Sequence, residues 1–183
     1  MAWSGETSGD FCIECQLDPL PVEWTVAWGH YRAGLERLLH AFKFEHHDFL
    51  EDSLATLLVE AIDSRADRDF DVVVPVPMHR SKERRRGYNQ AELLARAVAR
   101  NLGLAWRPRL LTKTRERKTQ STLPRSERAA NVRAAFRGSP AIEGMSVLLV
   151  DDICTTGETF RACATELLRA GAKRVCAVAV AKA

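Results

Sequence analysis

Three short apolar runs separated by helical patterns restrict the folds open to this chain. The runs are DVVVPVP at 71–77, SVLLVD at 146–151 and CAVAVA at 176–181, each suited to one buried strand. Amphipathic helical patterns at 89–103 and 158–170 lie between them. Strands that alternate with helices form a parallel sheet covered on both faces. The sequence therefore predicts an α/β fold with a parallel twisted sheet flanked by helices, Rossmann-like in its layout.

The remaining segments complete one domain. Leucines at helical spacing predict helices over 31–44 and 50–64, and RLLTK at 109–113 is a further candidate strand. We expect residues 31–183 to form this domain and residues 1–30 to be an N-terminal segment outside it. The predicted fold also includes a short N-terminal helical segment. No apolar run approaches the length of a membrane span, and the first residues lack the pattern of a signal peptide. A cytoplasmic protein with no membrane contact is the expectation.

Charge is distributed unevenly along the chain. Residues 1–70 carry 5 Lys and Arg against 14 Asp and Glu, whereas residues 71–140 carry 17 against 5. The formal net charge of +3 conceals this contrast. The basic middle of the chain indicates an anionic partner, which a phosphorylated small molecule and a nucleic acid both satisfy.

The stretch VLLVDDICTTGET, residues 147–159, places chemistry where a strand leads into a helix. Small hydroxyl residues and a glycine at a helix N-terminus suit a phosphate, because backbone N–H groups and the helix dipole both favour an anion. Asp151 and Asp152 would repel a phosphate placed on them, but their oxygens can accept hydrogen bonds from sugar hydroxyls. The stretch therefore suggests a clamp for a phosphorylated ribose. The alternative is an ordinary helix start with a threonine cap.

The order of these residues resembles the 13-residue signature of type I phosphoribosyltransferases, which bind the donor phosphoribosyl pyrophosphate (PRPP). In that signature an apolar run precedes two acidic residues and a Thr-Thr-Gly-x-Thr phosphate loop. The resemblance implies a role in nucleotide metabolism and assigns PRPP binding to a run of residues that begins at the acidic pair. They are Asp151, Asp152, Cys154, Thr155, Thr156, Gly157, Glu158 and Thr159.

Further blocks are similar to the ComF family, whose members resemble amidophosphoribosyltransferases. VPVPMHRSKERRRGYNQAELLA at 74–95, RKTQSTLPRSERAANVRAAF at 117–136 and YRAGLERLLHAFKF at 31–44 follow the family's blocks in the same order. The similarity covers about residues 12–183. It implies a phosphoribosyltransferase, a glycosyltransferase that moves a pentosyl group, and an association with natural competence and DNA uptake.

The resemblance also implies a pyrophosphate loop after the first strand. Its candidate residues are Met78, His79, Arg80, Arg84 and Arg86, since arginine can hold phosphate oxygens in a bidentate fork. Mg²⁺ would accompany the donor by bridging pyrophosphate and ribose oxygens. The alternative for this basic run is a solvated helix approach or a nucleic-acid patch. Residues 114–126 resemble the mobile loop of these enzymes, with Lys118 as a catalytic candidate beside the two aspartates and Gln120 as a second donor contact.

Cys12 and Cys15 form a C-x₂-C knuckle, which is half of a structural zinc site. ComF proteins commonly begin with two such knuckles, and here one is visible. Two ligands rarely hold Zn²⁺, so zinc is not the favoured expectation. The missing knuckle leaves open whether the native chain starts further upstream. The five cysteines, an odd number, argue against a disulfide framework.

Two functions of different classes follow from the sequence. The first is Mg²⁺-dependent transfer of phosphoribosyl from PRPP to an acceptor that the sequence does not identify. The second is a non-enzymatic competence factor that uses the clamp for ligand sensing, or binds single-stranded DNA or a partner protein. Residues 71–140 contain only Tyr88, Trp106 and Phe136 as aromatics, which weakens the case for a platform that stacks single-stranded DNA.

Overall fold

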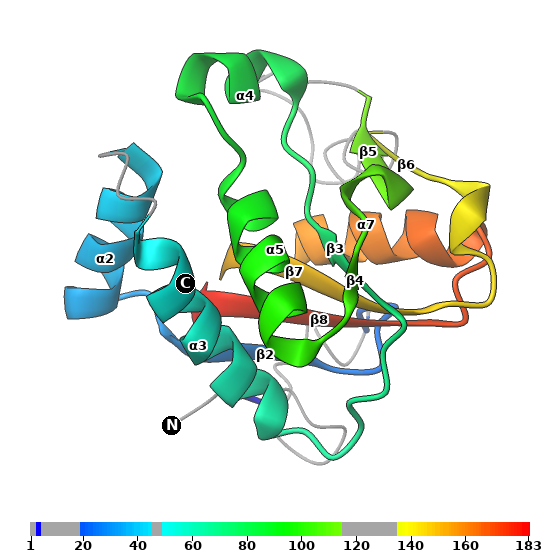
Figure 1. The fold of residues 1–183 in the computed structure, drawn as a ribbon, viewed down its shortest axis with the longest axis horizontal. Helices are drawn as coiled ribbons and strands as arrows, with labels where there is room; N and C mark the ends of the chain where they lie inside the picture. The colour runs from blue at the N-terminus through cyan, green and yellow to red at the C-terminus, as the bar shows by residue number, and fades with distance from the viewer. Residues whose placement is uncertain (1–2, 5–18, 45–48, 115–134) are drawn as a thin grey trace.

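A computed structural model describes residues 3–4, 19–44, 49–114 and 135–183, and its centre is a six-stranded sheet (Figure 1). The strand order is β1-β2-β8-β7-β3-β4. Five strands run parallel, and β1 at one edge is antiparallel to its neighbour. This confirms the predicted parallel α/β architecture. The strands are β1 (Trp3–Ser4), β2 (Thr25–His30), β3 (Val72–Pro75), β4 (Ala105–Trp106), β7 (Ser146–Cys154) and β8 (Arg174–Lys182).

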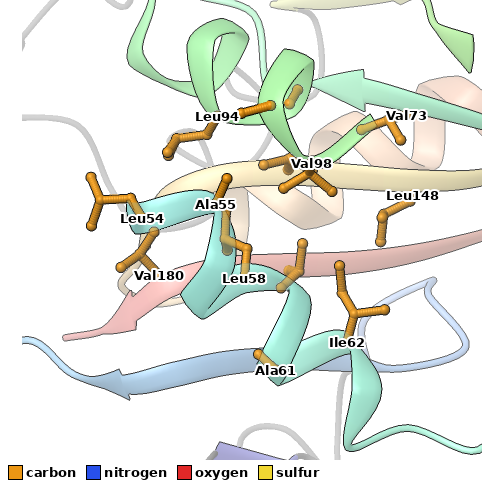
Figure 2. Close-up of a cluster of buried hydrophobic side chains, with 14 of the residues drawn as sticks. Leu54, Ala55, Leu58, Ala61, Ile62, Val73, Leu94, Val98, Leu148 and Val180 are labelled. Carbon is orange, nitrogen blue, oxygen red and sulfur yellow. The ribbon is translucent and has the colours of Figure 1, made fainter. Parts of the chain in front are cut away.

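Helices cover both faces of the sheet and divide the core into two layers. On one face, Leu58 and Val98 pack against Leu148 (Figure 2). On the other face, Phe160 and Leu167 pack against the alternate side chains of the same strands. Helices α3 (Leu50–Asp63) and α5 (Gln90–Leu102) cover the face that contains Leu58, and α7 (Glu158–Arg169) covers the opposite face. Helices α2 (Ala33–Phe44) and α4 (Arg80–Arg86) lie near the carboxyl ends of the strands (Figure 1).

Strand β2 is an element that the apolar periodicity did not predict. It pairs in parallel with β8, in register from Thr25 with Ala177 to His30 with Lys182. Val26 and Ala27 are fully buried, one on each face. The predicted domain boundary at residue 30 falls at the end of β2. Strand β2 itself belongs to the same sheet and the same core as residues 31–183.

A separate two-stranded sheet lies beside α7. The expected strand at 109–113 is shorter in the structure, because Pro108 begins a 3₁₀ turn that continues to Leu110. Gly138, at the end of the second strand, lies directly against the backbone of α7: a Cβ there would stand 2.5 Å from the carbonyl oxygen of Glu166. The elements are η1 (Pro108–Leu110), β5 (Leu111–Lys113), β6 (Phe136–Gly138) and η2 (Pro140–Ile142).

Across the ranges that the structure describes, no helix combines the length and the apolar character needed to cross a membrane.

Candidate functional site

Strand β7 is longer than the sequence suggested. It continues beyond residue 151 to Cys154, so both Asp151 and Asp152 lie within the strand. Successive side chains of a strand point to opposite faces, so the aspartates separate. Asp151 lines a small cavity of about 20 Å³ together with Thr155, Gly157 and Thr159. Asp152 forms an ion pair with Lys43 of α2, with 2.7 Å between Nζ and Oδ2. The structure thus brings Asp151, but not Asp152, to the cavity with the threonines.

Residues 155–159, here called the Thr-Gly loop, run from the end of β7 into the first turn of α7. Gly157 has a φ of 79°, a left-handed conformation that glycine adopts without strain. The hydroxyl residues Thr155, Thr156 and Thr159 are exposed, whereas Gly157 is buried. The first turn of an α-helix leaves backbone N–H groups without intrahelical acceptors. The loop therefore presents hydroxyls and helix N–H groups together, which is the donor set that a phosphate needs.

The Thr-Gly loop is supported from both sides. Lys182 at the end of β8 donates from Nζ to the carbonyl oxygen of Thr155 at 2.6 Å. On the outer side, Arg161 donates to the carbonyl oxygen of Pro19 at 2.8 Å, and Leu20 lies where a Cβ on Gly157 would meet it at 3.3 Å. The loop is consequently held between the last strand and the segment that leads into β2.

The carboxyl group of Asp151 is held in an unfavourable electrostatic setting. Burial raises the pKa of Asp151 well above its ordinary value, and the negative charge of Asp152 raises this pKa further. The backbone N–H of Asp152, which donates to Oδ1 of Asp151 at 2.9 Å, and the more distant Lys43 both oppose this rise in the pKa. A ligand that donates hydroxyl hydrogens to Asp151 would replace part of the lost hydration.

A second loop leaves the same edge of the sheet from β3, the strand next to β7. Residues 76–79, here called the β3 loop, end at His79, whose Nδ1 accepts from the backbone N–H of Ser81 at 3.3 Å and so caps α4. Asn89 occupies the N-cap position of α5 but does not cap it with its side chain. Its Nδ2 donates instead to the carbonyl oxygen of Val76 at 3.1 Å. The buried Asn89 therefore fixes the β3 loop to α5.

We expect replacement of Asn89 by alanine to lower the free energy of unfolding by about 1–3 kcal/mol, because the Val76 carbonyl loses its buried donor. Urea denaturation monitored by circular dichroism measures this change. Asn101→Ala, at an exposed position of the same helix, is the matched control and should change the free energy by less than about 0.5 kcal/mol. Equal effects of the two substitutions would contradict the assignment of Asn89.

A larger cavity of about 560 Å³ opens between the β3 loop, α4 and the β5–η1 segment. Three of the predicted pyrophosphate residues line it, namely Met78, His79 and Arg80. The other two do not: Arg84 is exposed, and Arg86 donates to Oε1 of Gln90 at 2.7 Å. Two cations that the sequence analysis passed over, Arg109 and Lys113, also line this cavity. They precede the segment that resembles a mobile loop, and their place beside the cavity follows from the fold.

The carboxyl-terminal end of α2 reaches this edge as well. Tyr88 donates from its hydroxyl to the carbonyl oxygen of Phe42 at 2.6 Å, and Phe42 is fully buried. Lys43 follows directly and meets Asp152. The sequence analysis did not single out Lys43, because a lysine in the last turn of an amphipathic helix is common and carries no motif.

Several predicted residues lie outside the part of the chain that the structure describes. They are Cys12 and Cys15, predicted as a zinc knuckle, and Lys118 and Gln120, which lie in sequence between β5 and β6. Their assigned roles stay predictions.

Comparisons with known proteins agree with the fold. The model of the phosphoribosyl transferase domain matches residues 43–183. The chain is 34% identical over 168 residues to "DNA utilization protein YhgH" of Salmonella typhi, covering 90% of this chain and 74% of that protein. It is 30% identical over 171 residues to "Competence protein F" of Haemophilus influenzae, covering 90% and 75%.

Among solved structures, the chain resembles glutamine PRPP amidotransferase from B. subtilis, solved in complex with ADP and GMP. The TM-score is 0.50 and the identity 23%, over 71% of this chain and 26% of that one. This likeness shows a shared fold.

Proposed function

Because the chain belongs to the phosphoribosyl transferase domain family and to its ComF-like members, we propose that it binds PRPP with Mg²⁺ and transfers the phosphoribosyl group to an acceptor in the cytoplasm. The observation that carries this proposal is the small cavity at the end of β7. The desolvated carboxyl group of Asp151 lines this cavity together with Thr155, Gly157 and Thr159 at the start of α7.

The chemistry of PRPP matches this arrangement group by group. Its 5-phosphate suits the hydroxyls and helix N–H groups of the Thr-Gly loop. Its ribose hydroxyls suit the oxygens of Asp151, which accept hydrogen bonds. Its pyrophosphate suits the cavity beside the β3 loop, where Arg80, Arg109 and Lys113 supply positive charge. Strands β3 and β7 are parallel neighbours, so both loops leave the same edge of the sheet.

Magnesium fits the donor chemistry of this edge. Mg²⁺ prefers oxygen ligands and retains several waters, so oxygens of PRPP together with the carboxylate of Asp151 are a suitable set. When bound, the ion would neutralise negative charge on the departing pyrophosphate. Arg80, Arg109 and Lys113 are proposed to stabilise the same leaving group from the protein side. The buried side chains of Cys154 and Phe160, which line the small cavity, are proposed to limit the access of water to the sugar.

A second candidate function keeps the clamp without the transfer. Helix α4 has no buried side chain, and Arg80, Lys82, Arg84 and Arg85 are exposed on it. This basic helix beside the donor cavity favours a competence factor that senses the ligand and contacts single-stranded DNA or an acidic partner. Binding of PRPP with no pyrophosphate release across a panel of acceptors would favour this second function over the enzyme.

We test the donor site with Thr159→Val, which removes one hydroxyl and preserves the shape of the side chain. Calorimetric titration should show that PRPP with Mg²⁺ binds the variant about 10-fold more weakly than the wild type, since a hydrogen bond to a charged group is lost. Ribose 5-phosphate should lose affinity by a similar factor, because it shares the 5-phosphate. Thr56→Val, at an exposed position of α3, is the control and should bind like the wild type. A folded wild type that does not bind PRPP would refute the proposed function.

A further inference from the structure

The ion pair between Lys43 and Asp152 is largely buried. The side chains are 19% and 12% exposed, respectively, and the atoms Nζ and Oδ2 are 2.7 Å apart. An ion pair in such a setting is screened little by solvent, and loss of one partner leaves the other charge poorly compensated. The pair joins α2 to the end of β7, two elements that are far apart in the sequence.

Packing around the end of α2 places Lys43 beside Asp152. Phe42, its neighbour in the chain, is fully buried, and its ring lies 6.5 Å from the ring of Tyr88. The hydroxyl of Tyr88 donates to the carbonyl oxygen of Phe42, so the last turn of α2 is tied to the residue that precedes Asn89. These contacts fix the backbone that carries Lys43 within reach of Asp152.

The pair changes the charge that a ligand meets at the end of β7. Two adjacent carboxylates would together repel PRPP, which carries a phosphate and a pyrophosphate. Asp151 faces the small cavity with the Thr-Gly loop, and Asp152 faces Lys43 on the other side of the strand. With Lys43 in place, one of the two negative charges is compensated, and the carboxylate that remains is the one that faces the cavity.

We propose that Lys43 is a positioning residue of the donor site: it holds and neutralises Asp152, which leaves Asp151 as the carboxylate that meets the sugar. This inference rests on the proposed function, because the ligand at the cavity is taken to be PRPP. It assigns unequal roles to the two aspartates, with Asp152 acting through Lys43 on the end of β7 and Asp151 acting on the ligand.

The test compares four variants by calorimetric titration with PRPP and Mg²⁺. Lys43→Met should weaken binding about 10-fold, and Lys43→Arg, which keeps the positive charge, should stay within about 3-fold of the wild type. In Lys43→Met/Asp152→Asn the unpaired charge is gone, so affinity should return to within about 3-fold of the wild type, and Asp152→Asn alone should bind in the same range. Lys173→Met is the control, since it removes an exposed lysine next to the start of β8, and should bind like the wild type.

The same variants provide a readout without ligand. Thermal unfolding should show that Lys43→Met destabilises the protein and that the added Asp152→Asn recovers part of the loss. A double variant that binds no better than Lys43→Met would overturn the inference, because Lys43 would then act on the ligand directly. Absence of coupling in the unfolding cycle, with a wild type that binds PRPP, would overturn it too. A wild type that does not bind PRPP overturns the proposed function and, with it, the donor-site role of Lys43, whatever the unfolding cycle shows.

Discussion

Replacing Asp151 with asparagine is expected to make the unliganded protein more stable and, at the same time, to abolish donor binding. Burial and the neighbouring Asp152 raise the pKa of Asp151, which means that the folded state binds the proton of this carboxyl more tightly than the unfolded chain does. Stability therefore falls as the pH rises from the ordinary carboxyl pKa to the raised pKa of Asp151. An asparagine keeps Oδ1 as the acceptor for the N–H of Asp152 and has no charge to bury.

At pH 7 we expect Asp151→Asn to have a higher unfolding free energy and a higher Tm than the wild type, because the variant has no charge to hold in this setting. Binding of PRPP should weaken about 100-fold or more, because the sugar hydroxyls lose a charged acceptor. Differential scanning calorimetry at pH 4 to 8 and titration calorimetry at pH 7 measure the two effects. The wild type should lose stability over this pH range relative to the variant.

Asp63→Asn is the matched control for this experiment. Asp63 is largely exposed and pairs with Arg68 on the surface, a kind of pair that contributes little to stability. Its substitution should leave both the melting temperature and the affinity for PRPP nearly unchanged. An Asp151→Asn protein that melts lower than the wild type, or that still binds PRPP with wild-type affinity, would contradict the role assigned to Asp151.

The second large effect is expected at Gly138, where an added methyl group has no room. A Cβ at this position would lie 2.5 Å from the carbonyl oxygen of Glu166 on α7 and 2.7 Å from the Cβ of Ala170, the C-cap residue of that helix. The first of these is a backbone atom, so relief requires α7 and β6 to move apart. We expect Gly138→Ala to lower the unfolding free energy by about 3 kcal/mol or more and the Tm by roughly 6–12 °C.

Gly34→Ala provides the comparison, because a Cβ on Gly34 in α2 meets nothing within 4 Å. Alanine is a better helix former than glycine, so this control should be neutral or slightly stabilising. Denaturation in urea gives both values from the same experiment. If Gly138→Ala melts within about 2 °C of the wild type, the close approach of β6 to α7 is not as the structure shows it.

Local patterns were sufficient to predict β3, β7, α5 and α7 beside the candidate site, but not α4, which the sequence analysis took as part of a pyrophosphate loop. The run SVLLVD predicted β7, and Gly103 and Gly171 lie at the ends of the predicted helices, where Gly103 caps α5 with a φ of 68°. The Thr-Gly loop was placed correctly at the start of a helix, because its signal lies within a few consecutive residues. Features of this kind depend on near neighbours in the chain, which a sequence displays directly.

The parts that were missed depend on contacts between distant residues. Strand β2, TVAWGH, has too few alternating apolar residues to suggest a strand alone, and its partner is β8. Lys43 acquires its role only because α2 ends beside Asp152. The separation of Asp151 from Asp152 follows from the continuation of β7, whereas the sequence suggested that the two carboxylates act together on one sugar.

The pairing of β2 with β8 has a consequence for how the molecule is made. Residues 25–30 leave the ribosome long before residues 174–182, the strand that they pair with. Until then Trp24 and Val26, which are buried in the finished protein, lack β8, and among the described strands β2 can pair only with the two residues of β1. Such long-range closure slows folding and leaves apolar segments open to association during the delay. This face of the core can therefore be completed only after residues 174–182 have been made.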